Sequence, residues 1–126
     1  MKRSFVGVLL LIALLLVGIV VQNKMEQMHR PVARLLDLSA QSALSGDWDG
    51  ARSLSGGASD RWQQSWKFSA AFADHEPMEE IDSLFSRMEV FSGEEDGPEF
   101  AAACRELARR IDAMADAHVL NWWNLF

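Results

Sequence analysis

A histidine flanked by carboxylates is the clearest candidate for chemistry in the sequence. His75 and Glu76 are followed by Glu79 and Glu80, one helical turn further on. An imidazole that titrates near neutral pH, placed beside a carboxylate, could act as an acid–base pair or hold a divalent metal ion. The same residues also suit the first turn of a helix, where carboxylates are favoured by the helix dipole. A structural role, a contact with a partner and a metal- or ligand-binding centre at His75 and Glu76 are therefore the alternatives.

Tryptophans form a second group of candidate residues. Trp62 and Trp66 lie four residues apart and share one side of a predicted helix, so they could line an aromatic groove for a peptide or glycan, or belong to the core. Trp122 and Trp123 are adjacent and cannot both face a core. One of them could contact a partner, the membrane interface or a second copy of the chain.

Motifs of known chemistry are missing from the sequence. It has no His-Glu-x-x-His, no glycine-rich phosphate loop and no Gly-x-Ser-x-Gly elbow. Cys104 is the one cysteine, which excludes an internal disulfide, and its place on an apolar helical seam predicts a buried, inert thiol. We therefore predict no catalytic residue, no metal ligand and no cofactor, and a protein that is not an enzyme.

The amino-terminal segment has the composition of a membrane span. Fifteen of the seventeen positions from Phe5 to Val21 are apolar and the other two are glycines. Residues 4–22 as a helix would measure about 28 Å, close to the roughly 30 Å of the hydrocarbon core. The run ends in branched residues rather than in a small-x-small cleavage site, which favours an uncleaved signal anchor. Because Lys2 and Arg3 form only a short basic tail, we expect the amino terminus in the cytoplasm and the rest outside the cell membrane.

The remainder of the chain is acidic. From residue 22 onward it carries ten basic and eighteen acidic side chains. This charge argues against nucleic acid as a partner, because phosphate binding needs clustered Lys and Arg. About 105 residues suffice for one compact domain. We therefore divide the chain into a tail and anchor (1–22) and an acidic helical domain (23–126).

Helical periodicity continues through this domain, with turn signals between the segments. The first segment continues from the span, with Pro31 expected to kink or restart the helix, Gly46 to end it and Asp47 to cap the next one. The later segments are predicted over 48–73, 78–92 and 99–118. Gly56 and Gly57 interrupt the second, where either the helix is weakened or a neighbour approaches the backbone closely. Gly93 is predicted to end the third segment and to open an exposed acidic loop over 93–98. On the third segment we expect the acidic side chains to face away from the apolar side: Glu79, Glu80, Asp82 and Glu89.

No stretch alternates as a half-buried strand does. The predicted fold is therefore all-α, with an N-terminal transmembrane helix followed by a small antiparallel bundle of about four helices.

Several short motifs resemble one bacterial family. They are Gly46-Asp47-Trp48-Asp49-Gly50-Ala51, the pair Trp62 and Trp66, Asp74-His75-Glu76, Arg87-Met88-Glu89 and the terminal Asn124-Leu125-Phe126. Together they resemble the domain-of-unknown-function family numbered 4363, whose members are short, membrane-anchored and helical. The resemblance would cover nearly the whole chain and implies no activity, substrate or cofactor.

These observations favour a non-catalytic, single-pass membrane protein that serves as an interaction or accessory module for a membrane partner. Homo-oligomerisation through the last helix is a further possibility. The alternative is a small metal- or ligand-binding protein or enzyme centred on His75 and Glu76.

Overall fold

The chain is almost entirely helical. The computed structural model describes the backbone of residues 2–72 and 75–124, and the side chains in these ranges except those of 25, 68–72, 75–76 and 115–124. The described residues form four helices and no strand, which confirms the all-α prediction. The helices are α1 (Lys2–Leu44), α2 (Trp48–Phe72), α3 (His75–Glu94) and α4 (Gly97–Asn124).

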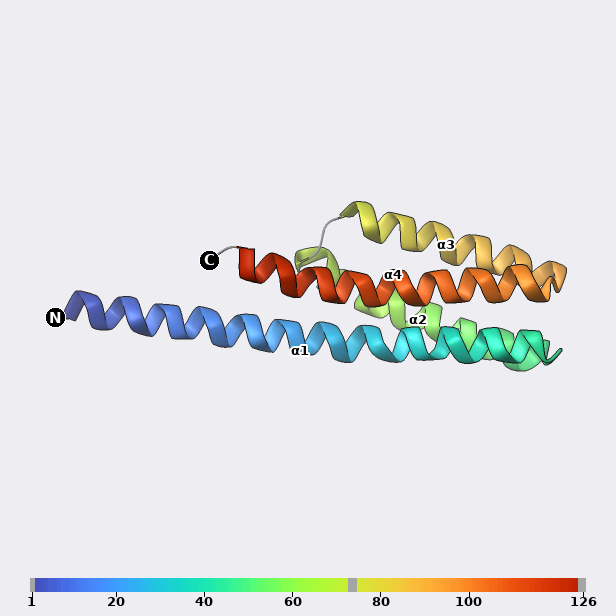
Figure 1. Cartoon of the computed structure of the whole chain (residues 1–126), viewed down its shortest axis with the longest axis horizontal. Helices are drawn as coiled ribbons and strands as arrows, with labels where there is room; N and C mark the ends of the chain where they lie inside the picture. Colours follow the sequence, from blue (N-terminus) through green and yellow to red (C-terminus); the bar gives the residue numbers. More distant parts are fainter. Residues whose placement is uncertain (1, 73–74, 125–126) are drawn as a thin grey trace.

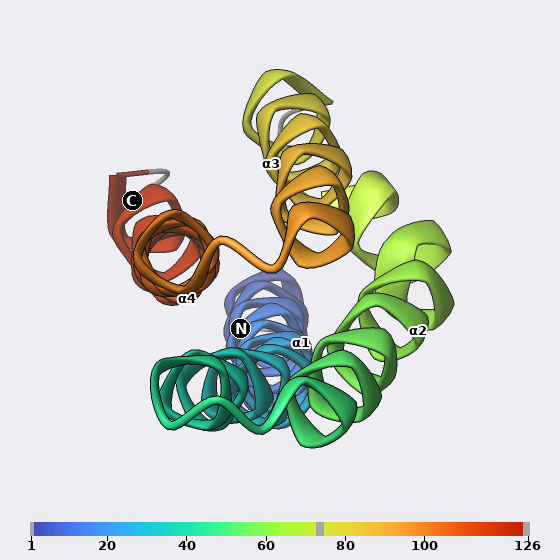
Figure 2. The ribbon, with the colours of Figure 1, turned by 90° about the vertical axis from the view of Figure 1, so that its right-hand side faces the viewer.

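Successive helices run in opposite directions, as Figure 1 shows. Seen from the end, α1 lies between α2 and α4, and α3 lies across from α1 (Figure 2). The closest packing joins α1 to α4 and to α2, whereas α3 rests mainly on α4 and touches α2 sparsely. One side of the assembly, between α2 and α3, is therefore held by few contacts.

A single helix links the apolar amino-terminal run to the packed part of the chain. α1 continues through Pro31 for 43 residues, so the expectation of a new helix at Pro31 is wrong. Proline removes one backbone hydrogen bond and costs about 3 kcal/mol in a helix interior. The next turn offsets this cost by burial, because Val32 and Leu36 are completely inaccessible to solvent.

The core follows the predicted seams closely. Each helix contributes side chains at three- and four-residue spacing. The apolar seam of α4, on which Cys104 was predicted to lie, is buried at Phe100, Cys104, Leu107, Ile111 and Met114. Besides Val32 and Leu36, the largest buried side chains are Trp62, Met78, Ile81, Met88, Phe100, Cys104, Leu107, Ile111 and, unexpectedly, His29.

The turn between α1 and α2 agrees with the prediction. Gly46 adopts a positive φ of 85°, and the amide of Asp47 donates to the carbonyl of Ser42 over 2.9 Å, which closes the end of α1. The Asp47 carboxylate then accepts the amide of Gly50 at 2.9 Å, at the start of α2.

The turn between α3 and α4 differs from the predicted loop. α3 passes through Gly93 to Glu94, and Glu95 takes the left-handed conformation, with a φ of 53°. The amide of Asp96 donates to the carbonyl of Phe91 at 3.1 Å, and its carboxylate accepts the amide of Glu99 at 3.3 Å. The turn therefore has the geometry of the first one, with Glu95 in the place of Gly46 and Asp96 in the place of Asp47.

The glycine pair of α2 neither breaks the helix nor admits a close neighbour. α2 is continuous over both residues. A Cβ at Gly56 would meet nothing within 4 Å, and one at Gly57 would lie at an ordinary 3.8 Å from Leu35 Cδ1. Of the two predicted alternatives, close approach is therefore wrong, and weakening of the continuous helix at the glycine pair stays a prediction.

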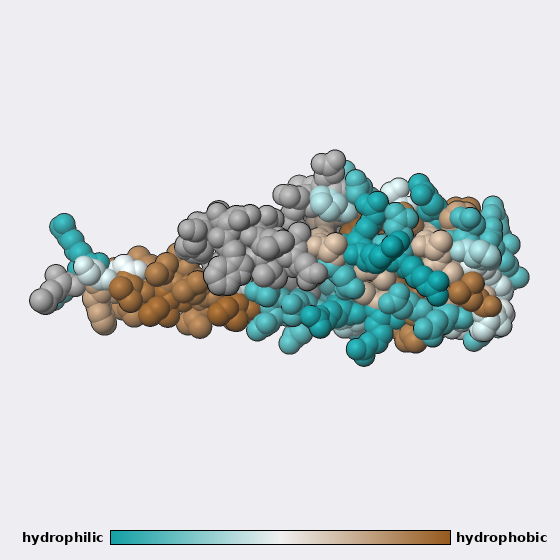
Figure 3. Space-filling model, viewed as in Figure 1, coloured by the Kyte–Doolittle hydropathy of each residue, from teal (hydrophilic) through white to brown (hydrophobic). Residues whose placement is uncertain are grey.

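The amino-terminal part of α1 projects from the other helices (Figures 1 and 3). Within the described residues, α1 is the one helix whose length and composition would allow it to cross a membrane. The apolar side chains in the amino-terminal part of α1 are exposed, and Figure 3 shows them as a continuous apolar surface on the visible face. Gly18 is the exception, being buried.

Candidate functional site

Asp82 of α3 bridges two tryptophans of α2. The indole N–H of Trp62 donates to Asp82 Oδ1 at 2.7 Å, and that of Trp66 donates to Oδ2 at 3.2 Å. The two indoles reach one carboxylate because residues four apart lie on the same side of a helix. Hydrogen bonds to a charged acceptor each contribute about 1.5–3 kcal/mol, so this bridge is a main link between α2 and α3.

Trp62 anchors the bridge in the core. Its side chain is 1% exposed and packs between the His29 ring of α1, with centroids 5.7 Å apart, and the Phe85 ring of α3, at 6.4 Å. Burial lowers the pKa of His29 to about 4, so the imidazole is neutral at neutral pH. Trp66 is only partly buried and covers the edge of the same cluster.

A second bridge joins the same two helices near the α3–α4 turn. The Arg52 guanidinium of α2 donates to the Ser92 carbonyl at 3.0 Å, to the Ser92 hydroxyl at 3.3 Å and to Glu95 Oε1 at 3.0 Å. The Arg52 guanidinium carbon also lies 5.8 Å from the centroid of the Trp48 ring. Arg52 precedes Trp62 by ten residues, and Ser92 follows Asp82 by ten, so the bridges are about 15 Å apart along both helices.

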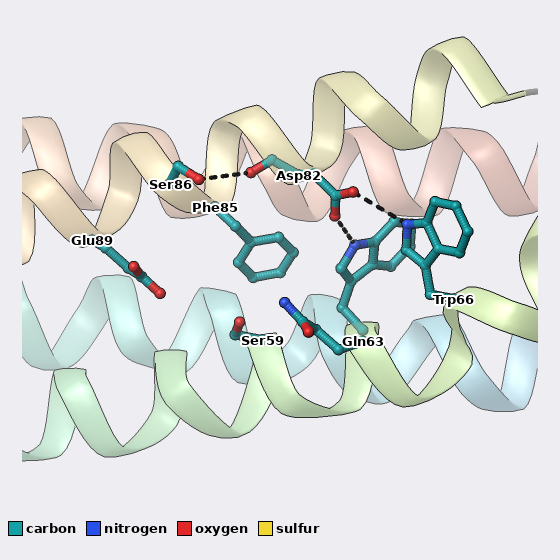
Figure 4. A pocket seen from close by; sticks show the side chains of 8 residues that line it. Ser59, Gln63, Trp66, Asp82, Phe85, Ser86 and Glu89 are labelled. Atoms are coloured by element: carbon teal, nitrogen blue, oxygen red, sulfur yellow. Dashed lines mark hydrogen bonds between the residues drawn. The ribbon is translucent and has the colours of Figure 1, made fainter.

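Between the bridges α2 and α3 leave a groove. Its volume is about 420 Å³, and Figure 4 shows its lining side chains converging from the two helices. A smaller hollow of about 180 Å³ extends it toward Arg52, beside Ser55 and Gly56. The main groove is lined by Ser59, Trp62, Gln63, Trp66, Asp82, Phe85, Ser86 and Glu89.

The groove offers hydrogen-bond acceptors and negative charge to a ligand. The described residues that line it include two carboxylates, Asp82 and Glu89, and no Lys, Arg or His. Both indole N–H groups already donate to Asp82, and the Ser86 hydroxyl donates to the Asp82 carbonyl at 3.3 Å. Glu89 takes part in none of the ion pairs among the described residues. The arrangement suits a ligand that brings hydrogen-bond donors and positive charge.

The predicted site residues have different outcomes. The structure brings Trp62 and Trp66 together at one carboxylate, with Trp62 in the core and Trp66 at the groove. α3 begins at His75, but the side chains of His75 and Glu76 lie outside the described residues. Trp122 and Trp123 fall within α4, and their side chains also lie outside the description.

One acidic residue was placed incorrectly from the sequence. Asp82 was expected to face away from the apolar side of α3, whereas its carboxylate accepts the indole N–H groups of Trp62 and Trp66; Glu89 is exposed and lines the groove. Asp82 follows Ile81 and precedes Phe85 by three, which places it at the edge of the buried face. The available signal was the pair of tryptophans, because buried indole N–H groups require acceptors.

Cys104 is the remaining group with candidate reactivity. The thiol is fully buried, and burial raises its pKa to about 12, so it lacks the thiolate character of a nucleophile. Among the described residues, no three His, Cys, Asp or Glu side chains are placed to hold a metal ion.

Comparison with protein-family models, with curated proteins and with solved structures gives no match to this chain.

Proposed function

We propose that this chain is a non-catalytic, single-pass membrane protein whose antiparallel helical bundle is an interaction module for a membrane partner. In this proposal residues 4–22 cross the cell membrane, the amino terminus is cytoplasmic and the bundle is extracytoplasmic. We also propose that the chain belongs to the bacterial family numbered 4363, because its sequence motifs resemble those of that family.

The observation that carries the proposal is the continuity of α1. One helix contains both the exposed apolar run and the buried residues Val32 and Leu36, with no linker between them. A helix of this kind transmits the orientation of the span to the bundle, unlike a flexible linker.

The helix register brings the end of α2 level with the last turn of the proposed span. His29 contacts Trp62, and α1 and α2 are antiparallel with the same rise per residue, so Phe72 at the end of α2 lies level with about residue 19 of α1. The buried Gly18 agrees with this register. A bundle held at this height would meet the extramembrane part of a neighbouring membrane protein at high effective concentration.

The groove between α2 and α3 is the proposed binding surface. It is the least tightly packed side of the bundle, and its two bridges hold its walls in place without filling it. A preformed groove reduces the entropy that binding must offset.

Topology is tested by cysteine labelling of the full chain in a Cys104→Ala background. We expect a membrane-impermeant maleimide to label Ala102→Cys in intact cells, because position 102 is exposed on α4, and to label Lys2→Cys only after the membrane is opened. The opposite labelling pattern would reverse the proposed orientation. Release of the unmodified chain from membranes by carbonate would contradict the span itself.

Partner binding is tested by photocrosslinking in the same cells. A photoreactive residue at Gln63, which is exposed and lines the groove, should give one discrete adduct with an integral membrane protein. The matched position is Ala102, also exposed, on α4 and outside the groove, where no such adduct should form. Identical adducts from both positions, or none from Gln63, would contradict the proposal.

A further inference from the structure

We propose that the groove between α2 and α3 binds an arginine side chain from the partner, with its guanidinium held by Glu89, attracted also by the charge of Asp82 and covered by Phe85 and Trp66. This inference rests on the proposed function, because it names the chemistry of the partner that occupies the same groove.

The groove has the size and the polarity for one long cationic side chain with its flanking peptide. Its volume of about 420 Å³ falls within the roughly 300–1,000 Å³ of small-ligand sites. Its polar lining would leave acceptors desolvated and unpaired under an apolar side chain, which disfavours such an occupant. Its two carboxylates and the lack of any cation among the described lining residues disfavour an anion.

The acceptors are arranged for several donors at once. Each Asp82 oxygen accepts one indole N–H and retains capacity for a second hydrogen bond. Glu89 lies two helical turns along α3 from Asp82 and points into the groove (Figure 4), so the two carboxylates mark its ends. Between them Ser59 and Gln63 of α2 offer further oxygens. A guanidinium carries five N–H donors in a fixed plane, whereas an ammonium carries three on one atom, so arginine matches this spread of acceptors better than lysine.

The chain already contains an example of the same recognition. Arg52 lies ten residues before Trp62 on α2. Its guanidinium is bound by the Glu95 carboxylate, the hydroxyl and backbone carbonyl of Ser92, and the face of Trp48. The groove presents three of these four kinds of groups, with Glu89 as the carboxylate, Ser59 as the hydroxyl and an aromatic pair, and none of its described lining residues is an arginine. The structure thus shows one occupied guanidinium site and, beside it, a larger groove of the same chemistry.

Charge outside the groove also favours a cationic ligand. The chain has a formal net charge of −6, and a basic segment would be attracted over a distance of about one Debye length, roughly 8 Å at physiological salt. Arg52, which lines the smaller hollow beyond Glu89, is already paired with Glu95 at 3.0 Å. Repulsion of an incoming arginine is therefore reduced at that end of the groove.

The test is a titration of the full chain in detergent micelles, with ¹⁵N-labelled tryptophan and Nα-acetyl-arginine amide as the probe. The indole N–H signals of Trp62 and Trp66, assigned with Trp66→Phe, report on the groove. We expect both to shift saturably with the arginine derivative and at least tenfold more weakly with Nα-acetyl-citrulline amide, which has the same shape without the charge. Glu89→Gln should weaken binding about tenfold, as loss of a charge-assisted hydrogen bond does. Glu79→Gln makes the same charge change on α3 outside the groove lining and should alter binding less than twofold.

Three results would overturn the inference: no saturable shift of the two signals, equal affinity for the arginine and citrulline derivatives, or equal losses in Glu89→Gln and Glu79→Gln. The crosslink from Gln63 does not depend on charge and distinguishes this inference from the proposed function. If Gln63 forms a membrane-protein adduct but the groove shows no preference for arginine, the proposed function stands and the arginine inference is wrong. If the groove binds arginine but Gln63 forms no adduct, the arginine inference stands and the proposed function is wrong.

Discussion

Trp62 donates its indole N–H to Asp82 at 2.7 Å and thereby connects the centre of the core to the wall of the groove. The indole ring is buried against α1, while the carboxylate comes from α3 and also accepts the indole N–H of Trp66. One carboxylate therefore both holds α2 to α3 and supplies charge to the surface that we propose as a binding site.

Removing this carboxylate should destabilise the fold. Asp82→Ala leaves the indole N–H groups of Trp62 and Trp66 without their acceptor in a partly buried place. We expect a loss of about 2–4 kcal/mol in the free energy of unfolding. Asp82→Asn retains one acceptor oxygen and should lose about half as much. Thermal melting followed by circular dichroism measures both variants. Glu79→Ala, an exposed acidic position on the same helix, is the control and should change stability by less than about 0.5 kcal/mol. Equal melting of Asp82→Ala and Glu79→Ala would show that the bridge contributes nothing.

Gly56 is a position where the chain can be stabilised. A Cβ there meets nothing within 4 Å, so Gly56→Ala should gain about 1 kcal/mol of helix propensity and raise the melting temperature. The matched variant is Gly50→Ala, also in α2, where the new Cβ would clash with Asp47 Oδ2. The capping carboxylate would have to move, which offsets the same gain in propensity. A melting temperature that rises equally in both variants would contradict the role of the Asp47 cap.

Acid should weaken the fold through His29. Burial lowers the pKa of His29 from 6.5 to about 4 in the folded chain, so the unfolded chain binds more protons between these values. The stabilisation is present above about pH 6.5 and is lost as the pH falls toward 4, by about 3 kcal/mol in total. Melting from pH 7.5 to 4.5 should show a smaller decline for His29→Leu than for the unmodified chain. Parallel declines would show that His29 does not carry this pH dependence.

Cys104 should resist thiol reagents until the chain unfolds. A thiol with a pKa of about 12 is ionised to about one part in ten thousand at pH 8, and its burial also blocks access. We expect modification by a maleimide at pH 8 to be at least a hundredfold slower than that of free cysteine, and to become fast in denaturant. Labelling of the native chain at the rate of free cysteine would place the thiol at the surface.

The sequence predicted features that depend on local patterns. Gly46 and Asp47 were identified because glycine favours a left-handed residue and aspartate favours a cap, and both effects act within one turn. The matching turn at Glu95 was missed, since a glutamate in the left-handed conformation carries no sequence signal and Gly93 nearby resembles a stop. Its geometry depends on Arg52 of another helix, which donates to both Ser92 and Glu95.

The groove could not be predicted because it depends on the distance between two helices. Trp62 and Trp66 were recognised as candidate residues, but their common acceptor lies sixteen and more residues away on α3. The two bridges pair residues twenty and forty apart in the chain, and only the fold brings these pairs into the same register.

Crosslinking from Gln63 in intact cells tests the central claim most directly, because it measures what lies over the groove while the chain is anchored in its membrane. We predict one membrane-protein adduct from Gln63 that is missing from Ala102. Adducts of equal yield from Gln63 and Ala102, or no adduct from Gln63, would contradict the claim.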